Sequence, residues 1–219
     1  MAIMMKRQLN EEEKEIILSR HGRVCYASGH VIPDGDKIHF DHIKAYSNNG
    51  PTELNNIAPM CEKHNLSKGQ LPLEDFRTKL KIDEFFSIGK RLTLKDLLKY
   101  LKGKNEIQDY GEKITYKIAN DKITIENHAI NQTFNIEICP LTNWKYFYCK
   151  LQVSVLDSDD DEEHSQGLQP RFLIMDKVFQ MFRHFQYYPV FQPSIGRIFN
   201  DKILLFDGQH KAASLLWTG

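Results

Sequence analysis

No stretch of the sequence approaches the roughly 20 consecutive apolar residues that a transmembrane helix needs, so the sequence predicts no membrane partner. The N-terminus lacks the apolar core and the small-residue cleavage site of a signal peptide, so we expect no export signal and a cytoplasmic location. Cysteine is also scarce, with only Cys25, Cys61, Cys139 and Cys149. In a reducing compartment, cysteines beside histidines more often bind metal than form disulfides.

The sequence has no excess of charge of either sign, since its formal net charge at pH 7 is zero. A neutral chain argues against binding nucleic acid through bulk charge alone. The charges are nevertheless uneven: residues 1–105 carry 18 Lys and Arg against 14 Asp and Glu, and residues 106–219 carry 11 against 15. So small a surplus is equally compatible with phosphate binding and with an ordinary solvated surface.

The N-terminal half alternates short apolar segments with turn residues. Acidic residues at the start of 8–20 favour a helix there, because the helix dipole favours negative charge in the first turn. The "PDGD" at 33–36 is typical of a hairpin between two strands. A helix is predicted from about Pro59 to Gly69, and further helices over 73–82 and 93–103.

The C-terminal half is richer in strand patterns. Strands are predicted within 113–119, 121–126, 133–141 and 145–156, a helix within 170–189, a hairpin over 196–206 turning at Asn200 and Asp201, and a tight turn opening a helix over 207–217. The acidic run 157–167 is expected to be an exposed flexible loop, because so many like charges repel one another.

Residues 39–69 concentrate three histidines, five asparagines and one cysteine. Asp41 and His42 lie at the end of a predicted strand, and Asn65 lies on the helix that follows. Because a hairpin followed by a helix folds back on itself, the carboxylate and the amide can meet over one ion. Their oxygens suit Mg²⁺, and His42 can take a proton from water near neutral pH. This combination indicates metal-assisted attack on a phosphodiester.

The segments "FDHI", "NN" and "CEKHNLSKG" resemble the HNH nucleases, which have a ββα-metal fold, over about residues 20–70. The resemblance implies DNA as the substrate and Mg²⁺ or Mn²⁺ as the catalytic ion. It makes Asp41 and Asn65 the metal ligands, His42 the general base and Asn56 the brace of the intervening loop. Lys68, one turn after Asn65, would reach the scissile phosphate. Asn65 stands where many relatives have His, a variant known within the family.

Many HNH nucleases also carry a structural zinc ion on two Cys-x-x-Cys pairs. This sequence has Ser28 three residues after Cys25, with His30 nearby, and His64 three residues after Cys61. Two interpretations stay open. Cys25, His30, Cys61 and His64 can form a tetrahedral Zn²⁺ site, or Cys25 packs as a small apolar residue. His39 and His30, each taken alone, are interpreted as structural residues.

The segment "DGQHKAASL" resembles the DGQHR-type motif of ParB-like domains. The resemblance implies a site for ATP, another nucleotide or a DNA phosphate, lined by Asp207, Gly208, Gln209, His210 and Lys211. Lys211 replaces the usual Arg and so loses bidentate phosphate recognition. An ordinary helix start explains the segment equally well. The chain ends within a helical pattern, which predicts an incomplete ParB-like domain.

The sequence thus predicts an α+β protein with an HNH endonuclease domain over 1–85, a helical connector over 86–105 and a β-rich α+β module over 106–219. The predicted function is metal-dependent DNA cleavage in bacterial restriction or anti-phage defence, with a C-terminal module that senses a nucleotide or a DNA modification. One site cuts one strand, so a double-strand break would need a homodimer or two encounters. The alternatives are a catalytically inert DNA-binding protein regulated by a nucleotide, and a C-terminal NTPase that gates the nuclease.

Overall fold

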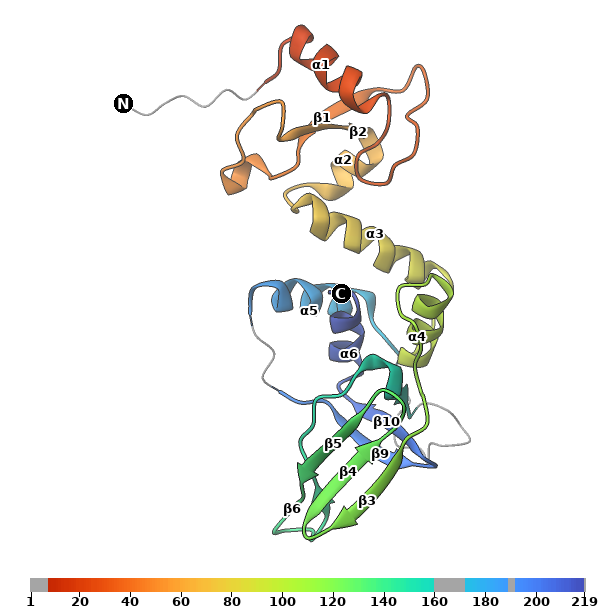
Figure 1. Ribbon diagram of the computed structural model, residues 1–219. Coiled ribbons are helices and arrows are strands. Elements are labelled where there is room, and N and C mark those ends of the chain that lie inside the picture. The colour runs from red at the N-terminus through yellow and green to blue at the C-terminus, as the bar shows by residue number, and fades with distance from the viewer. Residues whose placement is uncertain (1–7, 160–171, 189–191, 219) are drawn as a thin grey trace, which may run out of the picture. The chain divides into compact units, whose positions relative to one another are not determined.

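A computed structural model of the protein describes residues 8–159, 172–188 and 192–218 (Figure 1). The chain divides into two compact units, Met1–Glu84 and Phe85–Gly219, each considered separately below. Among the described residues, every helix is too short or too polar to cross a membrane.

The first unit is built around two antiparallel strands followed directly by a helix. The strands are β1 (Ile38–His42) and β2 (Ile57–Cys61), and His42 pairs with Ile57. Helix α2 (Glu62–Lys68) starts where β2 ends, because the Cys61 thiol accepts a hydrogen bond from the His64 amide at 3.4 Å. The remaining elements are α1 (Glu11–His21), the short 3-10 helix η1 (Tyr46–Asn48) and the start of α3 (Leu73–Ser87).

The core of this unit is formed by residues of the loop between α1 and β1, of β2 and of α3, namely Cys25, Ala27, Ile32, Met60, Leu73 and Phe76. Helix α1 begins at a capping box formed by Asn10 and Glu13, as the acidic start of the segment favours. The predicted strand, strand and helix order of residues 39–69 is confirmed.

Two predictions in this unit are wrong. The "PDGD" segment does not join two strands: residues 24 and 31 form only an isolated bridge, and the next strand starts at Ile38. The Arg23 guanidinium instead binds the carbonyls of Pro33 and Asp36 at 2.6 and 3.0 Å, so a side chain satisfies groups that a partner strand would otherwise bind. Pro59 does not start a helix, because it lies within β2 opposite Phe40.

The second unit combines three small sheets with three helices among its described residues. The helices are α4 (Leu94–Gly103), α5 (Met175–Tyr187) and α6 (Gln209–Leu216). Strands β3 (Thr115–Ala119), β4 (Lys122–Glu126) and β5 (Asn131–Asn135) form an antiparallel meander, and β6 (Glu137–Ile138) pairs with β7 (Lys145–Tyr146). The third sheet has the order β8 (Leu156–Ser158), β10 (Lys202–Asp207) and β9 (Ile195–Phe199), with η2 (Val153–Val155) leading into β8.

The hairpin predicted over 196–206 is confirmed, and both turn residues, Asn200 and Asp201, have the positive φ that a tight two-residue turn requires. The strands expected over 133–141 and 145–156 are shorter than predicted. They break up into β5, β6, β7 and the 3-10 turn η2.

The start of the acidic run is buried rather than exposed, which corrects another prediction. Residues 157 and 158 belong to β8, whose partner β10 runs parallel to it, and the Asp159 amide donates a hydrogen bond to the Leu205 carbonyl at 2.9 Å. Asp157 accepts a hydrogen bond from Lys202 at 2.9 Å, and Asp159, which is fully buried, binds Arg197 at 2.9 Å. These cations offset the repulsion that the sequence alone suggests. Residues 160–167 lie outside the described part of the chain.

Candidate active site

Two side chains of β1 each contact one side chain of α2. Alternation along the strand places His39 and Asp41 on one face, and a spacing of three places Asn65 and Lys68 on one face of the helix. The Asn65 Nδ2 atom donates a hydrogen bond to His39 Nδ1 at 3.1 Å. The Lys68 ammonium donates to Asp41 Oδ2 at 2.8 Å. Asp41 and Asn65 are therefore diagonal neighbours across the contact between strand and helix.

Lys68 is the most enclosed charge of this site, with 1% of its side chain exposed against 23% for Asp41. Its ammonium neutralises the Asp41 carboxylate. The family resemblance implies that this ammonium reaches the scissile phosphate, whereas in the structure it binds Asp41 and is shielded from solvent.

His42, the last residue of β1, lies beside Asp41 in the chain and contacts the loop that follows. Its Nε2 atom is 2.9 Å from the Thr52 hydroxyl, and its ring meets Tyr46 edge to face. Burial lowers the pKa of His42 below its ordinary value, and the positive charge of Lys68 adds to that effect while Asp41 opposes it. The imidazole is therefore neutral near pH 7 and able to accept a proton.

Asn56 ties together the loop between β1 and β2. Its Oδ1 atom accepts a hydrogen bond from the Lys44 amide at 2.9 Å, and its Nδ2 atom donates to the carbonyls of Lys44 and Pro51 at 3.1 and 2.8 Å. The loop closes so tightly that a Cβ at Gly50 would lie 1.8 Å from the Lys44 carbonyl oxygen. This network holds the chain immediately after His42.

The chemistry of these donors fits a hard divalent cation. Asp41 already binds one cation, the Lys68 ammonium, through Oδ2. The Asn65 amide directs its nitrogen at His39, so its oxygen lies on the other side of the planar group. A carboxylate and an amide oxygen are ligands that Mg²⁺ and Mn²⁺ accept.

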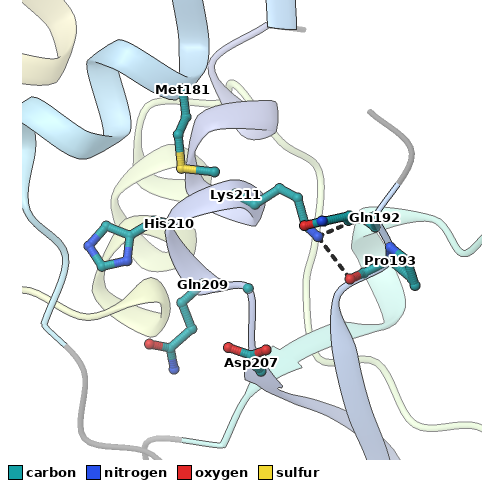
Figure 2. A pocket seen from close by; sticks show the side chains of 8 residues that line it. Met181, Gln192, Pro193, Asp207, Gln209, His210 and Lys211 are labelled. Carbon is teal, nitrogen blue, oxygen red and sulfur yellow. Dashed lines mark hydrogen bonds between the residues drawn. The ribbon is translucent and has the colours of Figure 1, made fainter. Parts of the chain in front are cut away.

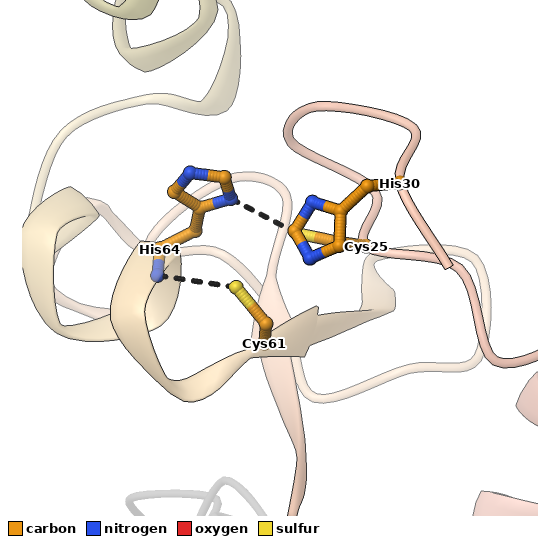
Figure 3. A group of neighbouring side chains, drawn as sticks. All are labelled: Cys25, His30, Cys61 and His64. Carbon is orange, nitrogen blue, oxygen red and sulfur yellow. Dashed lines mark hydrogen bonds between the residues drawn. The ribbon is translucent and has the colours of Figure 1, made fainter. Parts of the chain in front are cut away.

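A second cluster of ligands lies at the other end of α2 (Figure 3). Cys25, His30, Cys61 and His64 each direct one ligand atom into the cluster, and these atoms all lie within 4.8 Å of one another. Tetrahedral zinc needs separations of roughly 3.3–3.8 Å between ligand atoms, as follows from its bond lengths. The Cys25 sulfur is already 3.3 Å from His64 Nδ1. The four side chains of the predicted zinc site are therefore brought together and could hold a metal ion.

The pKa shifts of Cys25 and His64 favour the deprotonated forms that bind metal, whereas the shift of Cys61 does not. Burial alone would raise the pKa of the Cys25 thiol, but hydrogen bonds from Cys61, Ala27 and Ser28 outweigh burial and lower it. Burial and the nearby His30 lower the pKa of His64, which keeps its imidazole neutral. Burial raises the pKa of Cys61, and so would the negative charge of a Cys25 thiolate. A bound cation would favour the thiolate of both cysteines.

The predicted nucleotide-binding residues line a pocket of about 270 Å³ at the start of α6 (Figure 2). Gly208 has a φ of 84°, as expected for the turn before the helix. The Lys211 ammonium points to the carbonyls of Gln192 and Pro193, and the distance to Pro193 is 2.8 Å. His210 Nε2 accepts a hydrogen bond from the Ile174 amide at 3.0 Å. Lys211 would have to leave its carbonyl partners to meet a phosphate.

Gln209 and Asp207 differ sharply in their surroundings. Gln209 is 3% exposed, and neither amide atom has a hydrogen-bond partner within the described residues. Asp207 is exposed at the end of β10. Nucleotide binding at this pocket stays a prediction.

The antiparallel strand pair and the helix that follows it form a ββα unit, in which α2 contacts β1 through His39 and Asp41. Residues 23–71 match the family model described as HNH endonuclease. The matched segment includes both the contact between β1 and α2 and the Cys/His cluster. Searches of curated proteins and of solved structures found no match to the chain.

The contact between His39 and Asn65 was not predicted from the sequence, in which His39 taken alone is interpreted as structural. The available signal was its spacing of two from Asp41, which places both side chains on the same face of a strand.

Proposed function

We propose that the HNH domain hydrolyses DNA phosphodiester bonds with the help of a divalent cation. The observation that supports this proposal is the side-chain contact between β1 and α2, which lies within the segment that matches the HNH model. In that contact α2 meets the strand-end carboxylate of Asp41 through Lys68 and directs the Asn65 amide at His39, and His42 follows Asp41 in the chain. Nuclease activity is general in the family, and the substrate, the residues and their roles are our assignment.

Asp41 and Asn65 would hold Mg²⁺ or Mn²⁺, and a bound cation supplies positive charge to the phosphate and the departing oxygen. His42 accepts a proton from water as the water oxygen bonds to phosphorus and the bond to the 3′ oxygen breaks. In the tautomer in which Nε2 donates to Thr52, Nδ1 carries the lone pair that accepts this proton. The leaving oxygen is protonated by solvent, so the products are a 5′-phosphate and a 3′-hydroxyl.

Asn56 and Lys68 support the site in different ways. Asn56 fixes the chain after His42 through its three hydrogen bonds. Lys68 balances the charge of Asp41 from the protein side, and contact with the scissile phosphate would require its ammonium to move away from that carboxylate. The Cys25, His30, Cys61 and His64 cluster would hold Zn²⁺ as a structural ion, because the cluster ties the loop before β1 to the start of α2.

The proposal extends to the wider role of the protein. Its function would be in restriction or anti-phage defence, because a nuclease domain is joined to a C-terminal module whose resemblance to ParB-like domains at 207–211 suggests sensing of a nucleotide or a DNA modification. Homodimer formation likewise stays a prediction.

The test uses the full chain and an end-labelled DNA duplex, with Mg²⁺ or Mn²⁺ added after binding. We expect cleavage only with the cation, products with 5′-phosphate ends, and loss of cleavage in Asp41→Asn. The control is His128→Ala, which changes an exposed histidine outside the HNH domain. A protein that retards the duplex in a gel and leaves it uncut under either metal would be the inert DNA-binding alternative.

A further inference from the structure

The imidazole of His39 lies between two residues of α2, one on each ring nitrogen. Asn65 Nδ2 is 3.1 Å from His39 Nδ1. Glu62 Oε1 is 3.7 Å from His39 Nε2, which is near enough for attraction but too far for a hydrogen bond. Within the described residues, Nε2 has no hydrogen-bond partner although it is buried. Residues 62 and 65 are one helical turn apart, so α2 contacts His39 from both sides of the ring.

These contacts define the tautomer of His39. An amide nitrogen can only donate, so Nδ1 must be the acceptor, and the ring proton of the neutral imidazole resides on Nε2. That proton faces the Glu62 carboxylate. The chain of contacts thus runs from carboxylate to imidazole to amide, and each member restricts the orientation of the next.

The orientation of the Asn65 amide is the property that this chain controls. An asparagine amide can rotate to exchange its oxygen and its nitrogen, and only the oxygen can bind a cation. Because His39 accepts from the nitrogen, the oxygen is turned away from His39. The next residue on the same strand face is Asp41, the other proposed ligand.

We propose that His39 is a positioning residue that selects the metal-binding orientation of Asn65. The inference rests on the proposed function, since it concerns the same cation. Partners behind metal ligands orient them in this way, and their loss typically weakens metal affinity by about 10- to 100-fold. His39 does not itself contact the cation in this account.

The experiment compares two substitutions of similar size in the full chain. His39→Gln keeps a side-chain acceptor for the Asn65 amide, and His39→Leu removes it. Binding of Mn²⁺ alone, without DNA, is measured by electron paramagnetic resonance of the free ion. In the metal-free protein, nitrogen-15 NMR of the Asn65 side chain reports its hydrogen bond directly. His21→Ala, at the end of α1, is the control for loss of a histidine from the same unit.

We expect His39→Leu to weaken Mn²⁺ binding by about 10-fold or more, to shift the Asn65 amide signals and to recover cleavage when Mn²⁺ is in excess. His39→Gln should bind Mn²⁺ nearly as well as the original chain. If both variants bind Mn²⁺ like the original chain, the inference is wrong while the proposed function stands. If both variants are impaired equally, His39 acts through shape alone and the inference is also wrong.

Failure of the proposed function gives a different result. In that case the unsubstituted chain either binds no Mn²⁺ or binds it equally well after Asp41→Asn, and both proposals are overturned.

Discussion

Replacing Lys68 by Met tests the pairing at the centre of the HNH site. Methionine has a similar length and keeps the apolar packing of the lysine stem, so the substitution removes the charge and little else. The Lys68 ammonium lies 2.8 Å from Asp41 Oδ2. At an effective dielectric constant of about 20, Coulomb's law gives about 6 kcal/mol for this separation, before any desolvation cost.

The measured loss should be smaller than that attraction. Removing one partner of a buried pair typically costs about 3–5 kcal/mol. Because 23% of the Asp41 side chain is exposed, water can partly solvate the carboxylate that remains. We therefore expect Lys68→Met to lower the free energy of unfolding of the first unit by about 3 kcal/mol. Mg²⁺ should stabilise this variant more than the original chain, because no ammonium competes for Asp41.

The assay is amide hydrogen exchange of β1 and β2 at increasing urea concentration. Both tryptophans, Trp144 and Trp217, lie in the second unit, so tryptophan fluorescence serves as the internal control and should not change. Lys63→Met is the matched substitution at an exposed position of α2 and should change stability by less than about 0.5 kcal/mol. Equal effects of Lys63→Met and Lys68→Met would refute the reasoning.

Three further predictions concern the base, the loop and the Cys/His cluster. Because the pKa of His42 lies below its ordinary value of 6.5, and a bound cation would lower it further, cleavage should be constant above about pH 6.5 and fall only in more acidic solution. A pH profile with its midpoint above neutrality would contradict this assignment. Asn56→Asp keeps the acceptor for the Lys44 amide but turns a carboxylate toward two carbonyls. This substitution should destabilise the first unit by about 1–3 kcal/mol, as measured by urea denaturation. An unchanged midpoint of unfolding would show that Asn56 does not stabilise the loop between β1 and β2. Protein purified without chelators should contain one zinc ion per chain by mass spectrometry, and Cys61→Ser should lose the ion and melt at a lower temperature. Equal zinc content in both proteins would rule out the Cys/His site.

The order of elements around the HNH site was predictable because local signals agree. Asp41 and His42 end a short strand, Asn65 follows on a helix, and all three depend on contacts within about 30 residues of sequence. The pairing of Lys68 with Asp41 was not predictable. The family resemblance implies that Lys68 reaches the scissile phosphate. No local pattern in the sequence indicates that a lysine in the last turn of a short helix is buried.

The second unit illustrates the opposite case. Asp157 and Asp159 look solvated in sequence because they begin an acidic run. Their neutralising partners, Lys202 and Arg197, come 45 and 38 residues later on neighbouring strands. Only the pairing of β8 with β10 brings them together, and no local pattern indicates it. The hairpin predicted at 33–36 was wrong for a similar reason. The Arg23 side chain, which is ten or more residues away in sequence, donates hydrogen bonds to the carbonyls of Pro33 and Asp36 that a partner strand would otherwise bind.

The most direct test of the central claim is plasmid cleavage by the unsubstituted chain and by His42→Ala, with Mg²⁺ and then Mn²⁺, on modified and unmodified DNA. We predict that the unsubstituted chain nicks or linearises the plasmid, that His42→Ala binds DNA without cutting it, and that chelation stops the reaction. Cleavage that is unaffected by His42→Ala would contradict the assigned site, and the absence of cleavage under every metal would contradict hydrolysis by this chain.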